Sequence, residues 1–244
     1  MPRIRRIELI TFGFSRPIES FLRTSLFLGG IELNQKNIDN NKNLAVRFPK
    51  HPITRKLLKI LNFPLAAPSA NLSSKVSAVN AKDVKEDFGN KIKYILDGGS
   101  SSIGIESTII DLRGKPKILR LGGLETSLIQ KELKKKIKII KKPTKISSPG
   151  QFKLHYSPGI PVRLNAKKIK KKEAHLLIRK VKDSSSNQFF LSKKGDLNQV
   201  AKNLYSTLRE IKRKKFSSIA VEKIPNSGIG KAINDRLKRA SKYK

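Results

Sequence analysis

Pro64-Leu-Ala-Ala-Pro-Ser-Ala-Asn71, followed by Asp97-Gly-Gly99 and Gly104-Ile-Glu-Ser-Thr108, is the most informative part of this sequence. It places small hydroxyl and amide side chains in proline- and glycine-rich turns between short apolar segments. Such turns offer backbone N–H groups and small polar side chains to a phosphate or a ribose. The pattern predicts an α/β protein whose function lies in its loops.

Hydrophobic spacing on both sides of this stretch predicts alternating helices and strands. Apolar residues at helical spacing predict helices over 53–61, 81–88, 197–213 and 232–240, and Asn80 is expected to cap the second of these. A lysine-rich, helix-like run covers 131–142. Short apolar runs predict strands over 44–48, 65–67, 94–97, 107–111, 118–120, 162–164, 188–191 and 218–221.

A change in composition between about 127 and 160 divides the chain. Lysines there lead into Pro143, Ser147-Ser-Pro-Gly150 and Ser157-Pro-Gly159, a composition that is typical of a linker. We therefore expect an unassigned leader over 1–30, a sheet domain over 31–130, a linker over 131–160, and a smaller α/β domain of Rossmann-like type over 161–244.

The charge is strongly positive, with 54 Lys and Arg against 18 Asp and Glu, a formal net charge of +36. This charge predicts attraction to polyanions, although a lysine-, isoleucine- and asparagine-rich composition is also typical of an AT-rich genome. The chain has no cysteine, and its three histidines are scattered, which argues against disulfides and against a structural metal. It also contains no apolar run of about 20 residues, so we expect a cytoplasmic protein without a membrane partner.

Several side chains could carry the chemistry, and each has a structural alternative. Ser69 and Asn71 could bind a phosphate or a ribose, or could form an ordinary turn. Ser107 opens an apolar strand where backbone amides could meet an anion, or where they only cap the strand. Arg47 and Arg120 lie at the ends of apolar segments, where a guanidinium needs an anionic partner, either a ligand or a carboxylate of the protein.

Taken together and in this order, the segments resemble the YrdC-type threonylcarbamoyl-adenylate synthase family in its longer, two-domain form. The resemblance runs from about residue 44 to the end of the chain. It is carried by Ala45-Val-Arg-Phe-Pro49, Ala67-Pro-Ser-Ala-Asn71, Asp97-Gly-Gly99 with Gly104-Ile-Glu-Ser-Thr108, Leu119-Arg120 with Gly122-Gly123, Ser148-Pro-Gly150 with His155-Tyr-Ser-Pro158, and Gly228-Ile-Gly230 with Ala232-Ile-Asn-Asp-Arg-Leu237.

The resemblance implies a nucleotidyltransferase that condenses L-threonine, bicarbonate and ATP, with Mg²⁺ on the phosphates, to threonylcarbamoyl-adenylate and pyrophosphate. The product serves the modification of an adenosine beside the anticodon, so tRNA or the threonylcarbamoyl-transferase proteins are implied as partners. The implied residues are Arg47, Ala67 and Ser107 for threonine, and Asn43, Ser69, Asn71, Ser77 and Arg120 for ATP, with Tyr156 and Ser157 closing over the nucleotide.

The family's N-terminal elements do not appear upstream of Arg47. They are an apolar strand, a threonine-binding turn and a Lys-x-Arg segment that meets the triphosphate. From this we expect an N-terminally shortened sheet domain and an impaired enzyme. The alternative is a non-catalytic, basic RNA-binding protein on the same scaffold. A carbamoyl-transfer accessory protein related to hydrogenase maturation factors is disfavoured, because the chain lacks zinc-finger cysteines.

Overall fold

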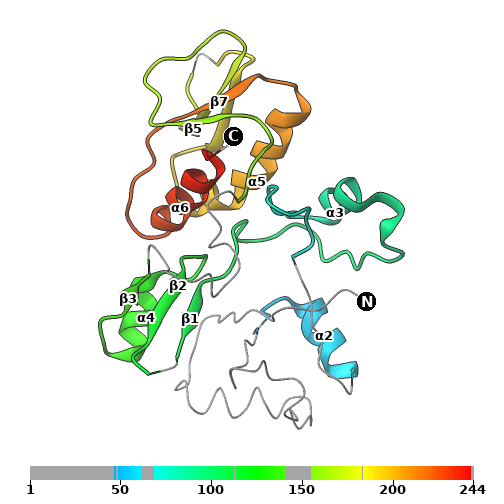
Figure 1. Ribbon diagram of the computed structural model, residues 1–244, viewed down its shortest axis with the longest axis vertical. Helices are drawn as coiled ribbons and strands as arrows, with labels where there is room; N and C mark the ends of the chain where they lie inside the picture. Colours follow the sequence, from blue (N-terminus) through cyan, green and yellow to red (C-terminus); the bar gives the residue numbers. More distant parts are fainter. Residues whose placement is uncertain are drawn as a thin grey trace.

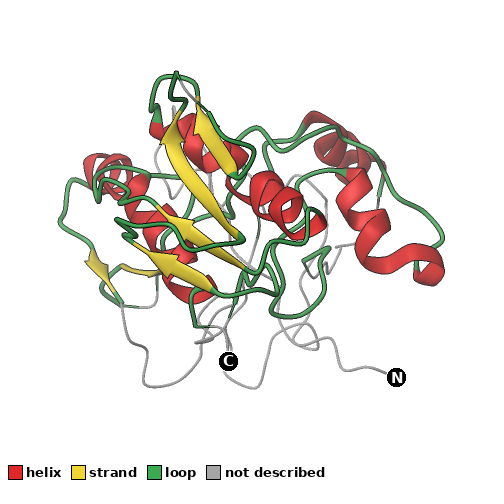
Figure 2. Ribbon diagram, turned by 90° about the horizontal axis from the view of Figure 1, so that it is seen from above, coloured by secondary structure: helices red, strands yellow, loops and turns green. Residues whose placement is uncertain are grey.

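A computed structural model describes residues 47, 49–61, 69–112, 114–140, 155–182 and 184–242. They form two sheets with helices beside them, a mixed α/β architecture (Figures 1 and 2). The elements are α2 (Pro52–Ile60), α3 (Ala81–Phe88), η2 (Gly89–Lys91), β1 (Ile109–Asp111), β2 (Lys117–Arg120), α4 (Thr126–Leu133), β3 (Lys138–Ile139), β4 (Val162–Leu164), β5 (Glu173–Arg179), β6 (Gln188–Ser192), α5 (Leu197–Arg213), β7 (Ser218–Val221) and α6 (Gly230–Ala240).

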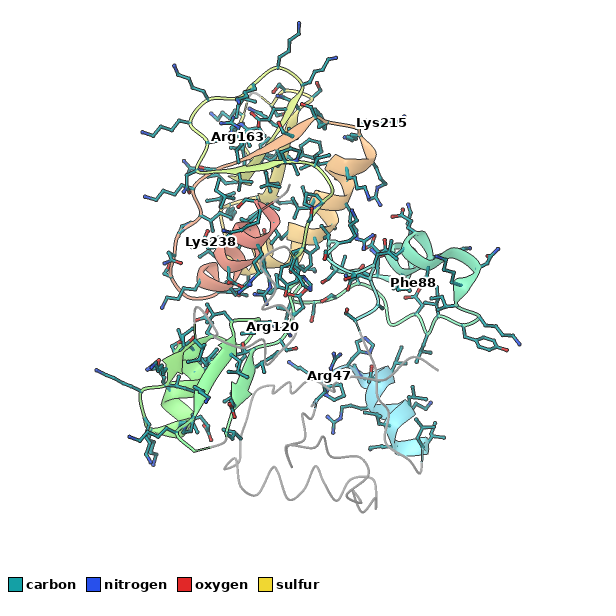
Figure 3. All side chains as sticks on the ribbon, in the orientation of Figure 1. Arg47, Phe88, Arg120, Arg163, Lys215 and Lys238 are labelled. Carbon is teal, nitrogen blue, oxygen red and sulfur yellow. The ribbon has the colours of Figure 1, made fainter. Side chains whose placement is uncertain are left out.

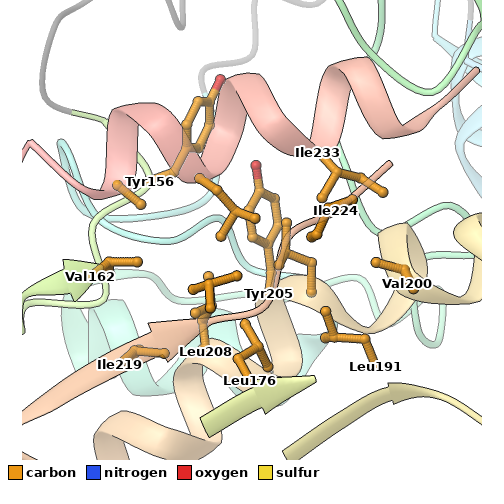
Figure 4. Packing of buried hydrophobic residues seen from close by; sticks show 14 of the residues in the cluster. Tyr156, Val162, Leu176, Leu191, Val200, Tyr205, Leu208, Ile219, Ile224 and Ile233 are labelled. Atoms are coloured by element: carbon orange, nitrogen blue, oxygen red, sulfur yellow. The ribbon is translucent and has the colours of Figure 1, made fainter. Parts of the chain in front are cut away.

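The C-terminal sheet has four parallel strands in the order β4-β7-β5-β6. Helix α5 packs on β5 and β6, and α6 packs on β4 and on α5. Apolar residues at helical spacing along α5, among them Val200, Leu204 and Leu208, are buried, so this stripe forms the centre of the main core (Figure 4). Asp196 caps α5 by accepting a hydrogen bond from the Gln199 amide at 2.7 Å.

The smaller sheet has the order β1-β2-β3, with β1 antiparallel and β3 parallel to β2. Its core consists of Ile118 on β2, Ile129 on α4 and Ile137 just before β3. Leu121, which directly follows β2, packs against this core and also against the main one. The strand end that carries the candidate residues is therefore joined to both cores.

Helix α3 begins and ends as the sequence predicts. The Asn80 side chain accepts a hydrogen bond from the Asp83 amide at 2.9 Å, and Gly89 ends the helix with a φ of 53°. Helix α2 is joined to the Asp97-Gly-Gly99 turn, because His51 Nε2 lies 3.0 Å from the carbonyl oxygen of Gly98. Helix α2 is thus tied to the turn that precedes the Gly104-Ile-Glu-Ser-Thr108 segment.

The main core is not confined to the C-terminal sheet. Val76, Ile105 and Tyr156 come from segments before that sheet, yet they are buried in the same cluster as α5 and α6. Ion pairs between α3 and α5 add to this contact, as Arg209 binds Asp87 at 2.7 Å. The N-terminal segments and the C-terminal sheet consequently share one packed interior.

Most of the predicted elements are confirmed. The helices over 53–61, 81–88, 197–213 and 232–240 correspond to α2, α3, α5 and α6. The strands over 107–111, 118–120, 162–164, 188–191 and 218–221 correspond to β1, β2, β4, β6 and β7. The predicted strand over 65–67 and most of the one over 44–48 lie outside the described residues.

Two predictions are wrong, and two strands were not predicted. Residues 94–97 form no strand, and the Tyr94 and Leu96 side chains are exposed. The helix predicted over 131–142 is instead the end of α4, which stops at Leu133, followed by β3 pairing with β2. Strand β5, which lies between β7 and β6 in the four-stranded sheet, was also not predicted. Among the described residues, none of the helices is both long and apolar enough to cross a membrane.

Candidate functional site

Glu106 lies at the point where the two parts of the chain meet, and three donors converge on its carboxylate. Ser77 donates its hydroxyl to Oε1. Tyr205 of α5 donates to Oε2 at 2.9 Å, and Arg236 Nε of α6 donates to Oε2 at 2.8 Å. Arg236 also donates from Nη2 to the carbonyl oxygen of Leu121 at 2.6 Å. Side chains of the C-terminal region therefore hold a residue of the glycine-rich segment.

The charge of Glu106 follows from these neighbours. Burial alone would raise the pKa of the carboxyl group. The guanidinium groups of Arg236 and Arg120 and the hydrogen bond from Ser77 oppose this effect, and together they lower the pKa of Glu106 to about 2. Glu106 is therefore an ionised hydrogen-bond acceptor at neutral pH.

Arg120 ends β2 and is buried, with 6% of its surface exposed. Its Nε donates to the carbonyl oxygen of Ser107 at 3.1 Å, so the guanidinium is fixed against the Gly104-Ile-Glu-Ser-Thr108 segment. Gly122 lets the chains approach, because a Cβ there would collide with the Ser107 and Thr108 backbone. The amide of Gly123 donates to the carbonyl oxygen of Glu106 at 2.9 Å and completes this contact.

The backbone of Ser77 is held from the opposite side by α5. Arg209 donates from Nη2 to the Val76 carbonyl oxygen at 2.8 Å and from Nε to the Ser77 carbonyl oxygen at 3.4 Å. Arg209 also forms a bidentate pair with Asp87. The main chain of Ser77 is thus fixed by Arg209 of α5 and its side chain by Glu106, while the residue remains half-buried.

The Tyr156-Ser157 segment packs into this region. Ser157 donates its amide to the Ser74 carbonyl oxygen at 2.9 Å and is buried. Tyr156 is 1% exposed and stacks on Tyr205 with ring centroids 5.8 Å apart (Figure 4). The Arg236 guanidinium lies over the Tyr156 ring, 5.0 Å from its centroid. The segment therefore belongs to the packed interior around Glu106 in this structure.

Two buried polar atoms in this segment have no hydrogen-bond partner among the described residues, the hydroxyl of Tyr156 and Nδ1 of His155. The two rings lie 4.0 Å apart. Burial is the main cause that lowers the pKa of His155 to about 4, and the nearby Arg236 and Arg120 act in the same direction, against the effect of Glu106. His155 is therefore neutral at pH 7.

The structure brings together only part of the predicted set. Ser77, Ser107, Arg120, Tyr156 and Ser157 all lie within the network around Glu106 or directly beside it. In Figure 3, Arg47 lies beside α2, whereas Arg120 lies at the end of β2 in the smaller sheet.

Two of the remaining predicted residues, Asn71 and Ser69, lie among the described residues. Asn71 is buried, and its amide nitrogen donates to the carbonyl oxygens of Leu72 at 2.8 Å and Lys75 at 3.3 Å, so this nitrogen closes a turn. Ser69 is exposed. Asn43 and Ala67 lie outside the described residues.

Sequence reasoning missed Glu106, Tyr205 and Arg236 as site residues. Glu106 and Arg236 both stand in segments that carried the family resemblance, Gly104-Ile-Glu-Ser-Thr108 and Ala232-Ile-Asn-Asp-Arg-Leu237, and that position was the available signal. Tyr205 carried no such signal, because it looks like one more apolar residue of an amphipathic helix. Among the described residues, no group of three histidine or acidic side chains is arranged to hold a metal ion.

Two family models match the chain. The model described as "Telomere recombination" matches residues 26–122, and the model described as "Threonylcarbamoyl-AMP synthase, C-terminal domain" matches residues 119–242. The first match begins upstream of residue 44, where the resemblance in the sequence was expected to start. The two matches overlap over residues 119–122, at the end of β2.

Curated relatives agree with the family models. The chain is 35% identical over 223 residues to a threonylcarbamoyl-AMP synthase of Pyrococcus abyssi, covering 82% of this chain and 64% of that protein. Synthases of Schizosaccharomyces pombe and Bacillus subtilis are 32% and 30% identical, each over 82% of this chain, and 57% and 63% of their own lengths are covered. The chain thus spans about three fifths of the length of these relatives.

A solved structure shows the same fold. The crystal structure of P. abyssi Sua5 complexed with L-threonine matches with a TM-score of 0.76 and 29% identity, covering 98% of this chain and 81% of that one. A second Sua5 structure from P. abyssi, of a variant with a histidine and a tyrosine replaced by alanine, matches with a TM-score of 0.71 and 33% identity, over 82% and 63% of the two chains.

Proposed function

Because this chain belongs to the two-domain threonylcarbamoyl-AMP synthase family, we propose that it makes threonylcarbamoyl-AMP from L-threonine, bicarbonate and ATP. The amino group of threonine and bicarbonate give a carbamate and water. A carbamate oxygen then attacks the α-phosphorus of ATP, and pyrophosphate leaves. We further propose that the product is used for tRNA modification in the cytoplasm. The partners of the chain would then be tRNA or the threonylcarbamoyl-transferase proteins.

The observation that supports the proposal most directly is the network around Glu106. Ser77 and Arg120, expected to contact ATP, and Ser107, expected to line the threonine pocket, are joined through Glu106 and the backbone of Ser107. Two substrates that must react with each other need binding groups held at a fixed separation. The network supplies such a fixed frame.

Positioning and charge stabilisation would supply most of the catalysis. A carbamate is a weak nucleophile towards phosphorus, so the reaction benefits from holding it in line and from cations opposite the developing charge. Arg120 is the cation we assign to the phosphates, and Arg47 is the one we assign to the threonine carboxylate. Neither role requires a covalent intermediate on the protein.

Mg²⁺ would enter with ATP. The Glu106 carboxylate already accepts hydrogen bonds from Ser77, Tyr205 and Arg236, so it fits a role in holding these donors rather than a role as a metal ligand. Mg²⁺ in nucleotide sites is held largely by phosphate oxygens and water. When bound, it would neutralise charge on the phosphate oxygens.

The test is pyrophosphate release from ATP by the purified chain, with and without L-threonine and bicarbonate. We expect release that requires both co-substrates and that falls by at least ~100-fold in Arg120→Ala. Arg179→Ala, which removes an exposed arginine of β5, is the matched control and should retain activity. Absence of release from folded wild-type protein would contradict the proposal.

The net charge of +36 favours a second candidate function, non-catalytic binding of RNA. Binding that rests on several phosphate contacts weakens about 10³- to 10⁵-fold between 50 and 200 mM salt. An RNA affinity with this steep salt dependence, in a protein that does not discriminate ATP from other polyanions, would support the second candidate over the first.

A further inference from the structure

The single hydroxyl proton of Ser77 is already used in a hydrogen bond to Glu106. Ser77 Oγ donates to Glu106 Oε1, and an ionised carboxylate can only accept hydrogen bonds. A serine hydroxyl carries one donor and two acceptor lone pairs. Once the proton points at Glu106, Ser77 Oγ can offer only its lone pairs to a ligand.

We propose that Glu106 is a positioning residue that makes Ser77 Oγ a hydrogen-bond acceptor for the nucleoside part of ATP. The inference rests on the proposed function, because the assignment of Ser77 to the ATP site comes from the family. The inference adds the direction of the hydrogen bond, and this direction determines which part of ATP Ser77 contacts. The matching ligand group is a ribose hydroxyl or the exocyclic amine of adenine, both of which carry a hydrogen to donate.

A phosphate oxygen does not match this arrangement. The phosphate oxygens of ATP at neutral pH are almost all acceptors, and two acceptors that face each other without a hydrogen repel and lose their water. A serine that binds phosphate has to donate its proton to it. Ser77 cannot do so while Glu106 holds that proton.

Glu106 acts only as a hydrogen-bond acceptor, because its second carboxylate oxygen, Oε2, also accepts hydrogen bonds. Tyr205 and Arg236 both donate to Oε2, which leaves Oε1 for Ser77. These donors and the nearby guanidinium of Arg120 favour the ionised carboxylate and hold its pKa at about 2. A protonated Glu106 that could donate to Ser77 is therefore excluded over the range in which enzymes of this kind are assayed.

The position of Ser77 is fixed as firmly as the direction of its proton. Arg209 holds the carbonyl oxygens of Val76 and Ser77, and Glu106 holds the hydroxyl. Because Arg209, Tyr205 and Arg236 all come from α5 and α6, the C-terminal region sets the hydrogen-bonding character of a residue in the N-terminal part. The half-buried Ser77 still has surface available to a ligand.

The experiment compares nucleotide affinities by calorimetry in wild type and Ser77→Ala. The probes are ATP, 2′-deoxy-ATP, 3′-deoxy-ATP and purine riboside triphosphate, which lacks the exocyclic amine. We expect wild type to bind one of these analogues about 5- to 30-fold more weakly than ATP, because one hydrogen bond is lost. In Ser77→Ala the same analogue and ATP should bind equally. The analogue that behaves in this way identifies the donor as ribose or base.

Glu106→Gln tests the positioning role. A glutamine amide can donate to Ser77 Oγ, which occupies one of its two lone pairs and frees the serine proton, so the ratio of the two affinities should fall below the wild-type ratio while the protein still binds ATP. Because this change also leaves Arg236 without its carboxylate, Tyr205→Phe serves as a second variant. It removes one donor to Glu106 but keeps the carboxylate that accepts the Ser77 proton, so it should keep the wild-type ratio. Ser102→Ala, an exposed serine of the neighbouring loop, is the control and should leave every ratio unchanged.

The outcomes separate the inference from the proposed function. If wild type binds ATP and releases pyrophosphate but Ser77→Ala keeps the wild-type ratio for every analogue, the inference is overturned and the proposed function stands. If Ser77→Ala weakens ATP and all analogues by one common factor, Ser77 contacts the phosphates and the inference is also overturned. If folded wild type does not bind ATP at all, both fail.

Discussion

Arg209 of α5 forms a bidentate ion pair with Asp87 of α3. Its Nη1 donates to Oδ1 at 3.0 Å and its Nη2 donates to Oδ2 at 2.7 Å. One turn further along α5, Arg213 binds Glu86 with both distances at 3.1 Å. The first pair is almost buried, with side-chain exposures of 10% and 12%, whereas the second is exposed, at 47% and 37%. The two pairs join the same helices in different surroundings.

This difference predicts unequal effects on stability. Arg209→Ala leaves the Asp87 carboxylate and two backbone carbonyl oxygens without their donor inside the protein, so we expect a loss of about 3 kcal/mol in the free energy of unfolding. Arg213→Ala removes an exposed pair and should cost less than about 1 kcal/mol. Urea unfolding of both variants at pH 7 measures the difference, and equal losses would mean that the Arg209 network contributes no more than a surface pair.

A second prediction concerns the close approach of β2 to the Glu106 segment. Gly122→Ala places a Cβ against the backbone of Glu106, Ser107 and Thr108, which cannot move aside without breaking the contact. We expect this variant to lose at least about 3 kcal/mol of stability and its pyrophosphate release.

Gly123→Ala is the matched control for this prediction. Its Cβ would lie 2.6 Å from the Cγ2 atom of the Ile103 side chain, and a side chain can rotate or shift where a backbone cannot. We therefore expect a loss of only about 1 to 2 kcal/mol. Thermal unfolding of the two variants and their activities give the comparison, and a Gly122 variant as stable as the Gly123 variant would show that the backbone contact tolerates a methyl group.

Local patterns were sufficient to predict most of the fold. Helix α5 and strand β7 lie where the spacing of apolar residues places them, because each buries one stripe or one short run. The hydrophobic pattern gave the wrong prediction where tertiary contacts determine the secondary structure. Residues 94–97 have a strand-like composition but no pairing in the structure, and residues 138–139 form a strand only because β2 lies beside them.

Strand β5 was missed for a related reason. It begins with Glu173, a residue that is depleted in strands, and this carboxylate is buried because Arg163 on β4 binds it bidentately at 2.6 and 2.9 Å. The candidate site shows the same limit. Arg120 could be chosen from local sequence and Ser77 from the family resemblance, whereas the contact of Arg236 with Glu106 joins residues 130 positions apart and is visible only in the folded chain.

The buried imidazole of His155 predicts a dependence of stability on pH. Its pKa falls from 6.5 to about 4 on folding, mainly because burial disfavours the charged ring. The unfolded chain therefore binds a proton more readily, so the contribution of His155 to stability is full above pH 6.5 and is lost as the pH falls towards 4. The loss should approach roughly 3 kcal/mol.

The measurement compares wild type with His155→Gln, a variant that cannot titrate in this range. Urea unfolding at pH 7, 6, 5 and 4 gives the difference in unfolding free energy between the two proteins. We expect this difference to change in favour of the variant as the pH falls, with most of the change between pH 6.5 and 4. A constant difference would show that His155 titrates alike in the folded and unfolded states.

The last prediction separates the two arginines assigned to substrates. Arg47 is half-buried beside α2, and we assign it to the threonine carboxylate. Arg47→Ala should raise the KM for L-threonine by about 10- to 100-fold, the effect of losing one charge-assisted hydrogen bond of about 1.5 to 3 kcal/mol, and should leave ATP affinity within about twofold of wild type. Arg55→Ala, which removes an exposed arginine of α2, should change neither constant. Steady-state pyrophosphate release with each substrate varied in turn measures both. A variant whose affinity for ATP falls as far as its affinity for threonine would place Arg47 at the nucleotide and not at the amino acid.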